Sequence, residues 1–170
     1  MIREATEKDL EEILEIYNTA IVNTTAVYHY NPQTLEERNN WFDKKKENEE
    51  PVLVFVEAGE VLGFATFGTF RPWPAFKYTI EHSIYVANRG KGKGIGSKLL
   101  STLIELASKR DYKTIVAGID ASNPASIGLH EKFGFIHSGT IRNAGYKFGE
   151  WLDLAFYQLD LQGPAEPREG

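Results

Sequence analysis

The 170-residue sequence contains no cysteine, which excludes disulfide frameworks, cysteine nucleophiles and thiolate metal sites. It also lacks any stretch close to the about 20 consecutive apolar residues that a membrane-spanning helix needs. The chain does not begin with a basic segment followed by an apolar run, so we expect no secretory signal. These absences fit a reducing compartment, and we expect a cytoplasmic protein with no membrane partner.

Neither charge is in large excess, because 19 Lys and Arg residues oppose 24 Asp and Glu residues. The net charge of -5 argues against a nucleic-acid partner, which usually meets a basic face. His29, His82 and His137 lack partners at metal-ligand spacing, so we expect no metal site. Because a domain typically has about 100–200 residues, the length corresponds to one domain. We assign residues 1–162 to this domain and residues 163–170 to a disordered tail.

Hydrophobic periodicity and turn signals predict the order strand, helix, helix, three strands, helix, strand, helix and two strands. The predicted elements cover residues 1–5, 10–17, 34–48, 52–57, 61–70, 77–86, 95–108, 114–119, 124–133, 135–141 and 151–161. Thr6 and Asp9 predict a cap before the first helix, and residues 18–33 indicate a long loop or broken helix. The order predicts an α/β (α+β) domain in which helices pack on a mixed sheet.

Residues 86–98 depart from the average charge, since they hold four cations and no acid: Arg89, Lys91, Lys93 and Lys98. The segment lies between a predicted strand and a predicted amphipathic helix. Its glycines allow consecutive N–H groups to converge on an anion, and the positive end of the following helix adds to the attraction. We therefore predict a site that binds a diphosphate, with the four cations close to its negative charges.

The spacing of these glycines fits neither a nucleotide P-loop nor a dinucleotide fingerprint. The segment Lys91-Gly92-Lys93-Gly94-Ile95-Gly96 instead resembles the loop that binds the pyrophosphate of acetyl-coenzyme A in the GNAT superfamily of N-acetyltransferases. A flexible basic linker is the alternative. A linker would not be framed so closely by a strand and a helix, so the resemblance is favoured, with acetyl-coenzyme A as co-substrate.

The segments Asn123-Pro124-Ala125-Ser126 and 129–135 resemble the second GNAT motif. In that motif an Asn opens a helix beside the pantetheine arm, which places Asn123 and Ser126 at the coenzyme. Asn123 is also expected to cap this helix, with Pro124 at the first helical position. The resemblance further implies that the pantetheine and the thioester carbonyl meet the backbone of Ile84, Tyr85 and Val86.

Residues 71–86 and 144–153 resemble segments of phosphinothricin and methionine sulfoximine acetyltransferases, so the resemblance covers residues 1–161. It implies a GNAT fold, with a mixed, mostly antiparallel sheet of about seven strands flanked by about four helices. It also implies transfer of an acetyl group to the α-amino group of a small amino acid or analogue (phosphinothricin, methionine sulfoximine or methionine sulfone), by an enzyme that is typically a homodimer. Because no cysteine can carry the acyl group, direct transfer to the amine is favoured.

Glu81 is the predicted general base, the group that takes the proton of the amine. It is the only acid in the predicted strand 77–86, and acids are depleted in strands. It also matches the position of the glutamate proposed as base in the resembling family, where a water is an option for relaying the proton. The alternative is a solvated carboxylate on an exposed face of the strand.

His130 departs from the pattern of many GNAT enzymes, which carry a Tyr at this position. That Tyr acts as general acid toward the thiolate. Asn123, Ser126 and His130 fall three or four residues apart and therefore share a helical face. Histidine can act as an acid near neutral pH, and the resembling branch also carries His there. A packing role or a simple coenzyme contact is the equal alternative.

Arg71 is predicted to bind the carboxylate of the acceptor, since arginine binds carboxylates bidentately and its Arg-Pro-Trp-Pro turn is expected to line the acceptor cleft. Trp73, Phe76 and Tyr78 are candidates for the wall of the side-chain pocket, and Lys147 is a weaker candidate for the substrate site. The alternative for these residues is a surface contact in the dimer.

Two other functions remain as alternatives to an amino-acid N-acetyltransferase. One is acetylation of a different amine, such as a protein N-terminus, a polyamine or an aminoglycoside. The other is a non-catalytic sensor that binds acyl-coenzyme A, which Glu81, the predicted pocket aromatics and the intact coenzyme loop disfavour.

Overall fold

The computed structural model describes residues 1–170, and it contains the predicted elements in the predicted order. The helices are α1 (Leu10–Asn23), α2 (Leu35–Glu47), α3 (Ile95–Lys109) and α4 (Pro124–Lys132). The strands are β1 (Ile2–Glu4), β2 (Val52–Glu57), β3 (Glu60–Thr69), β4 (Thr79–Val86), β5 (Thr114–Asp120), β6 (Ile136–Lys147) and β7 (Glu150–Asp160). Short 3-10 helices cover Glu7–Asp9, Pro74–Phe76 and Asn88–Gly90.

The strands form one seven-stranded sheet in the order β1-β2-β3-β4-β5-β7-β6. Strand β4 pairs with β5 in parallel, whereas the pairs β1–β2, β2–β3, β5–β7 and β6–β7 are antiparallel. The predicted fold class, a mixed sheet of seven strands with four helices, is therefore confirmed.

Helix α1 is longer than predicted. It continues to Asn23, so the first six positions of the loop or broken helix predicted for residues 18–33 are helical. Ile21 is fully buried and extends the apolar stripe of the helix. Asn18, one of the polar residues that indicated a loop, exchanges two hydrogen bonds with the backbone of Gln33. Its side chain therefore holds the following loop against the helix rather than ending the helix.

Strand β6 is also longer than predicted, since it ends at Lys147 and not at residue 141. Most of its side chains are exposed, so the alternation of apolar and polar residues that marks a half-buried strand is missing. Pairing with β7 maintains the strand instead, for example through Tyr146 opposite Trp151. Their rings lie 5.0 Å apart, a cross-strand contact that stabilises a hairpin.

The chain divides into two compact units. We call residues 1–67 and 83–100 the N-terminal unit, and residues 68–82 and 101–170 the C-terminal unit.

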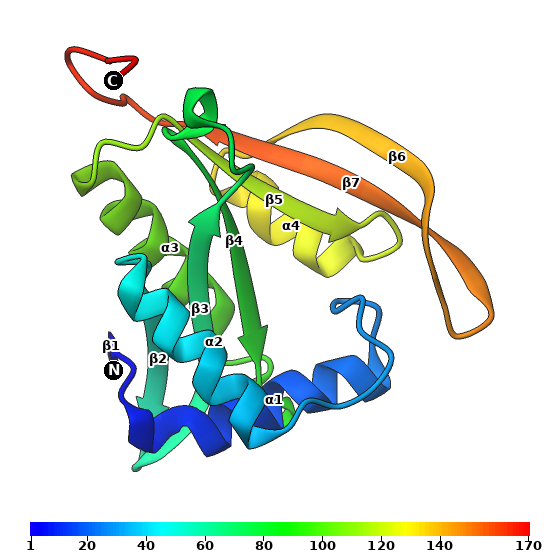
Figure 1. Ribbon diagram of the computed structural model, residues 1–170. Helices are drawn as coiled ribbons and strands as arrows, with labels where there is room; N and C mark the ends of the chain where they lie inside the picture. The colour runs from blue at the N-terminus through cyan, green and yellow to red at the C-terminus, as the bar shows by residue number, and fades with distance from the viewer. The chain divides into compact units, whose positions relative to one another are not determined.

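In the N-terminal unit, α1 and α2 cover one face of β2 and β3 (Figure 1). Apolar side chains of these elements form a common core: Leu10, Ile13, Ile16, Phe42, Val52, Val54, Val61 and Phe64. The start of α3 packs closely on β3, because a Cβ added at Gly63 would lie 3.0 Å from the side chain of Ile95. Residues 52–55 are all buried, as expected for a strand covered on both faces.

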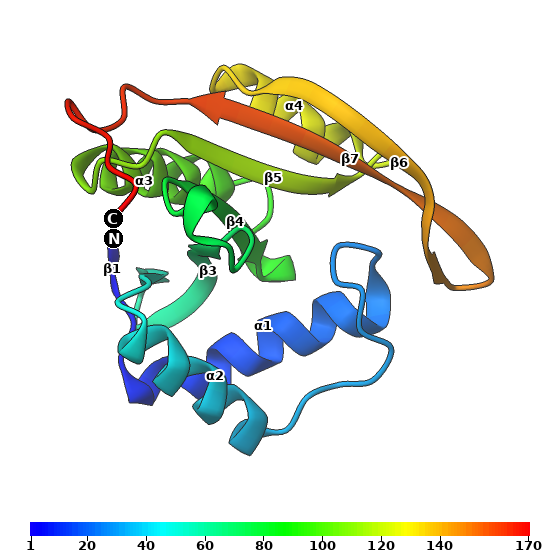
Figure 2. The ribbon, with the colours of Figure 1, turned by 45° about the horizontal axis from the view of Figure 1, so that its top comes forward.

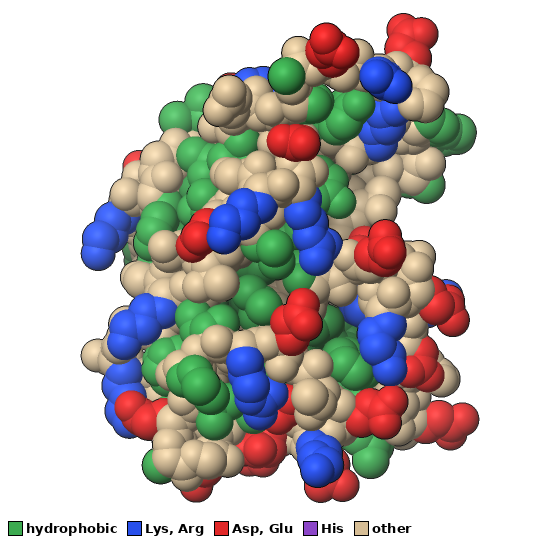
Figure 3. Space-filling view, turned by 90° about the vertical axis from the view of Figure 1, so that its left-hand side faces the viewer, with side chains coloured by type: hydrophobic (Ala, Val, Ile, Leu, Met, Phe, Trp, Pro, Cys, Tyr) green, Lys and Arg blue, Asp and Glu red, His purple; other side chains and the backbone are tan.

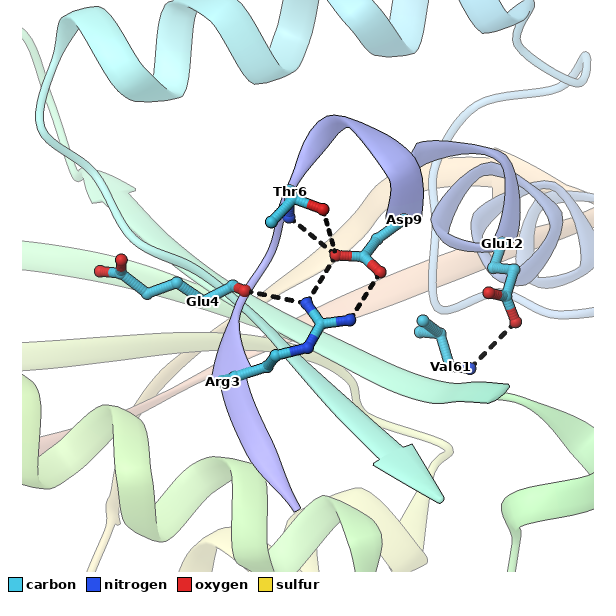
Figure 4. Close-up of polar contacts among 6 residues, drawn as sticks. All are labelled: Arg3, Glu4, Thr6, Asp9, Glu12 and Val61. Carbon is cyan, nitrogen blue, oxygen red and sulfur yellow. Dashed lines mark hydrogen bonds and ion pairs between the residues drawn. The ribbon is translucent and has the colours of Figure 1, made fainter. Parts of the chain in front are cut away.

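The start of the chain is anchored by a bidentate ion pair (Figure 4). Arg3 donates to both carboxylate oxygens of Asp9, at 2.8 and 2.9 Å, and the backbone N–H of Thr6 donates to the same carboxylate at 2.7 Å. The hydrogen bond from Arg3 holds the pKa of Asp9 below its usual range. The predicted cap is confirmed. Beside it, Glu12 accepts from the backbone N–H of Val61 at 2.9 Å, which fixes α1 to β3.

In the C-terminal unit, β7 lies between β5 and β6, and α4 runs alongside these strands (Figure 2). The pairing of β5 with β7 ends at Asp120 and Leu154, whereas β6 and β7 pair onward to Lys147 and Glu150. The end of the β6–β7 hairpin therefore projects beyond β5. It carries three exposed large apolar side chains, Tyr146, Phe148 and Trp151, and Ile141 is exposed at its base, opposite Leu154.

None of the helices combines the length and the apolar character that a bilayer crossing requires. On the face shown in Figure 3, basic and acidic side chains are interspersed among apolar ones.

Candidate active site

The predicted coenzyme loop leads from β4 into α3. Gly92 and Gly94 have φ angles of 79° and 75°, a left-handed conformation that glycine adopts without steric cost. A Cβ added at either position would meet nothing within 4 Å, so the glycines are required by the backbone conformation and not by crowding. The first N–H groups of α3, which begins at Ile95, have no partner within the helix. Loop and helix therefore present the backbone donors that bind diphosphates.

The cations of this loop differ in their partners. Arg89 Nε lies 3.2 Å from Glu60 Oε2, and Lys93 Nζ lies 3.0 Å from Glu57 Oε2. Lys91 has no such ion pair, and it lines a cavity of about 270 Å³ together with residues of α1 and β4. Exposed ion pairs are weak, so Arg89 and Lys93 can release these glutamates and bind another anion. Lys91, in contrast to Arg89 and Lys93, forms no ion pair with an acidic side chain.

The first turn of α4 is capped as predicted. The Asn123 side-chain oxygen accepts from the backbone N–H of Ser126 at 3.2 Å, and Pro124 occupies the first helical position. The cap uses only the oxygen of the amide, so the amide nitrogen of Asn123 retains its two donors. A cap and a ligand contact are therefore compatible at this residue.

Glu81 is half-buried in β4. Removal from water raises the pKa of its carboxyl group, and the nearby positive charge of Arg71 partly opposes this rise. A Cβ added at Gly118 of β5 would lie 3.2 Å from Glu81 Oε2, so the absence of a side chain at Gly118 leaves room for the carboxylate. A carboxylate with a raised pKa binds and releases protons closer to neutral pH, as a general base must.

His82 and His130 form a buried, stacked pair, with rings 5.0 Å apart and nearly parallel. His130 Nδ1 lies 2.6 Å from the carbonyl oxygen of Ser126, which can only accept, so this nitrogen carries the proton. His130 Nε2, 3.0 Å from His82 Nε2, must then accept from the latter. The remaining nitrogen, His82 Nδ1, has no hydrogen-bond partner.

Burial keeps both rings neutral. It lowers the pKa of His82 to about 3, with a further contribution from His130, and it also lowers the pKa of His130. The pairing of His82 with His130 was not predicted from the sequence, because the two residues are 48 positions apart. Neighbouring residues of a strand point to opposite faces, so the sequence indicates that His82 points away from Glu81, but it does not identify His130 as the partner.

The predicted substrate residues have different surroundings. Arg71 is exposed, and its guanidinium lies 4.3 Å from the ring of Phe70. Trp73 is 66% exposed. The backbone N–H of Arg168 donates to the hydroxyl of Tyr78 at 3.0 Å, so Tyr78 contacts the end of the chain.

Phe76 and Lys147 complete the predicted set. The ring of Phe76 packs edge-on against Phe70 at 6.0 Å, which places it in the same turn as Arg71. Lys147 is buried at the end of β6, 5.1 Å from the ring of Phe148, and burial lowers the pKa of its ammonium group. Among the substrate candidates, Arg71 is the one whose charge acts on Glu81.

Residues 2–156 match the family described as acetyltransferase (GNAT) domain. The chain belongs to the GNAT acetyltransferases. It is 48% identical over 161 residues to an L-methionine sulfoximine/L-methionine sulfone acetyltransferase of Pseudomonas aeruginosa, covering 94% of each chain. Its fold matches the crystal structure of an N-acetyltransferase from Staphylococcus aureus with a TM-score of 0.95 and 64% identity, over 95% of this chain and 98% of that one.

A third relative is a phosphinothricin acetyltransferase from Sinorhizobium meliloti, whose structure was determined in complex with acetyl-coenzyme A. It is 36% identical, with a TM-score of 0.94 over all of this chain and 94% of that chain. This GNAT enzyme is accordingly an acetyl-coenzyme A-dependent transferase. Its own residues fit the coenzyme: two glycines with positive φ shape the loop, the first turn of α3 supplies backbone donors, and Lys91 supplies a cation.

The buried histidine pair predicts a specific dependence of stability on pH. In the unfolded chain a histidine binds a proton below its ordinary pKa of about 6.5, whereas His82 in the folded protein does not until about pH 3. The unfolded state therefore binds more protons, and stability falls as the pH drops through this window. Between about pH 7 and about pH 5, His82 alone should remove roughly 2 kcal/mol from the free energy of unfolding.

The test is urea denaturation of the wild type and of His82→Gln at both pH values. Glutamine can still donate to His130 but does not titrate, so this variant should lose roughly 2 kcal/mol less than the wild type on acidification. His137→Gln, a change at an exposed histidine, should behave as the wild type does. Equal acid sensitivity of His82→Gln and the wild type would contradict the assignment.

Proposed function

We propose that this GNAT enzyme transfers an acetyl group from acetyl-coenzyme A directly to the α-amino group of a small amino acid or analogue. The observation that carries the proposal is the environment of Glu81, a half-buried carboxylate beside Gly118 whose pKa burial raises and the nearby positive charge of Arg71 lowers. An amino acid presents an amine and a carboxylate, which need a base and a cation respectively. The Pseudomonas relative, named for methionine sulfoximine and methionine sulfone, and the phosphinothricin acetyltransferase support this substrate class.

In this proposal, each group of residues has a separate role in binding or in the reaction. The loop Lys91–Gly96 and the start of α3 bind the diphosphate, the backbone of residues 84–86 binds the pantetheine, and Asn123 and Ser126 contact the same arm. Acetyl-coenzyme A supplies an already activated thioester. Glu81 accepts the proton of the acceptor amine, directly or through one water, and so presents a neutral nucleophile. Arg71 holds the acceptor carboxylate, and Trp73 and Phe76 contribute apolar surface in the same turn.

His130 acts as a positioning residue in this proposal and not as the acid for the thiolate. Both of its ring nitrogens are engaged, one by the Ser126 carbonyl and the other by His82. Burial also disfavours the protonated ring that an acid requires. Its hydrogen bond within α4 orients the first turn, which carries Asn123 and Ser126.

The substitution Glu81→Gln tests the base. It should lower kcat by about 100-fold or more, the usual contribution of a positioned general base, in a thiol-release assay with acetyl-coenzyme A and a panel of amino acids and other amines. The acid limb of the kcat/KM profile that belongs to Glu81 should also disappear, while the limb from the acceptor's own ammonium group remains. Glu105→Gln, on the exposed surface of α3, is the matched control and should retain wild-type turnover.

Three results would count against the proposal. Full turnover of Glu81→Gln across the pH range would exclude Glu81 as the general base. Thiol release only with polyamines, peptides or aminoglycosides would favour a different acceptor, and coenzyme binding without release would favour a sensor.

The substitution Arg71→Ala tests carboxylate recognition. The KM for amino acids should rise by about 10-fold or more, as expected for the loss of a hydrogen bond to a charged group, while the KM for acetyl-coenzyme A stays unchanged. Because Arg71 lowers the pKa of Glu81, the acid limb of the kcat/KM profile should also move to higher pH. An unchanged KM for amino acids would exclude Arg71 from the substrate site.

We also propose that the enzyme is a cytoplasmic homodimer that associates through the projecting end of the β6–β7 hairpin. Exposed apolar side chains gather there, and Trp151 is 66% exposed. Trp151→Lys should shift the wild-type dimer toward monomer in sedimentation velocity, because it places a charge in an apolar contact. Trp73→Lys changes a tryptophan of equal exposure and should leave the dimer intact. Dissociation by Trp73→Lys alone would instead place the interface at the 71–78 turn.

A further inference from the structure

Arg38 of α2 is a buried cation without an anionic partner. It is only 2% exposed, and no carboxylate lies within ion-pair distance of it. Its guanidinium donates to the side-chain oxygen of Gln33 and stacks on Tyr17 and Trp41, 4.0 and 4.4 Å from the ring centroids. Its Nε has no hydrogen-bond partner. Such a group is costly to bury unless a ligand or partner satisfies it.

The guanidinium lines a cavity of about 200 Å³ in the N-terminal unit. The rings of Tyr17, Phe64 and Tyr85 line the cavity. The centroid of the Tyr85 ring lies 5.4 Å from that of Tyr17 and 5.3 Å from that of Phe64. No acidic side chain lines the cavity, so Arg38 supplies its only permanent charge. Burial raises the pKa of Tyr85 to about 12, which keeps this phenol neutral. The chemistry of the cavity therefore favours an anion or a strong oxygen acceptor with a small apolar part.

The dimensions of the cavity fit part of a small acceptor, and two of its lining residues belong to the strand of Glu81. At about 30 Å³ per water-sized group, its volume holds a carboxylate, sulfone or phosphinate with one or two methylene groups. Ser83 and Tyr85, which line it, follow Glu81 by two and four residues in β4. Residues at this spacing in a strand share a face.

We propose that the Arg38 cavity is a subsite for an oxygen-bearing group of the acceptor amino acid, held by hydrogen bonds from the guanidinium. The inference rests on the proposed acetylation of amino acids and extends it to the part of the acceptor that is recognised. The oxygen group belongs either to the α-carboxylate, which Arg38 then binds in addition to Arg71, or to an oxidised side chain such as a sulfone. Both groups accept hydrogen bonds from the guanidinium in the same way. They differ in which acceptor amino acids should lose affinity when Arg38 is replaced.

The test compares Arg38→Gln, Arg38→Lys and the wild type with L-methionine and L-methionine sulfone as acceptors. Dissociation constants are measured by titration calorimetry in the presence of coenzyme A, and KM values by thiol release. Arg38→Gln should weaken acceptor binding by about 10- to 100-fold, with the KM for acetyl-coenzyme A unchanged. Arg38→Lys should restore part of the affinity, because the charge returns. Lys44→Gln removes an exposed cation from the same helix and should have no effect.

The pattern of losses identifies the source of the oxygen group. Equal losses for both acceptors support the inference with the α-carboxylate as ligand, and a loss confined to the sulfone supports it with the side chain as ligand. Wild-type affinity of folded Arg38→Gln for both acceptors would overturn it. So would a fall in melting temperature with parallel losses for acceptors and acetyl-coenzyme A that lysine does not repair, since stacking alone would explain that result.

Failure of the proposed function gives a different result. A wild type that neither binds amino acids by calorimetry nor releases thiol with them would overturn both proposals. A wild type that acetylates amino acids normally, beside an equally active Arg38→Gln, would overturn only the subsite.

Discussion

Strand β4 carries ionisable side chains on both of its faces, and their removal from water governs what each of them can do. For Glu81, partial burial favours the protonated form and raises the pKa of the carboxyl group, which brings it toward the range of a working base. For His82, the next residue, burial has the opposite consequence, since it lowers the pKa of the ring to about 3. The two-residue period of the strand thus separates a half-buried carboxylate on one face from a neutral, buried imidazole on the other.

The neutrality of His82 has a structural consequence in the C-terminal unit. A neutral imidazole has one donor and one acceptor, and the carbonyl of Ser126 decides which nitrogen of His130 is the donor. That choice fixes the direction of the hydrogen bond between the rings and therefore the proton position on His82. Helix α4 has only nine residues, too few to be stable alone in water. Its order depends on tertiary contacts such as this pair. Asn123 and Ser126, the two residues proposed to contact the coenzyme, depend in turn on the order of the helix.

The sequence predicted what is local and missed what is not. The coenzyme loop and the Asn123 cap rest on residues within a few positions of one another, so their spacing alone carries the information. The order of strands and helices followed from periodicity in the same way. The extension of α1 to Asn23 was missed because Asn18, a polar residue that indicated a loop, is part of the helix and binds the following loop from there. The long β6 was missed because it is maintained by pairing with β7 and not by burial.

The two arginines proposed to bind the acceptor illustrate the same limit. Arg71 was predicted as a substrate residue because it lies in a recognisable turn before the strand of Glu81. Arg38 resembled any charge on a surface helix, and only the folded chain shows that Tyr17 and Trp41 enclose it.

The difference in burial between these arginines also bears on specificity. An exposed cation such as Arg71 stays hydrated when an acceptor cannot reach it, so only the hydrogen bonds between Arg71 and that acceptor are lost. Arg38 lies in a site of lower polarity, where its interaction with an oxygen acceptor is stronger. An acceptor that enters the cavity without such an oxygen leaves the buried donor unpaired, and that cost is the more effective form of discrimination. The cation that is more expensive to bury is therefore the one better suited to select the acceptor.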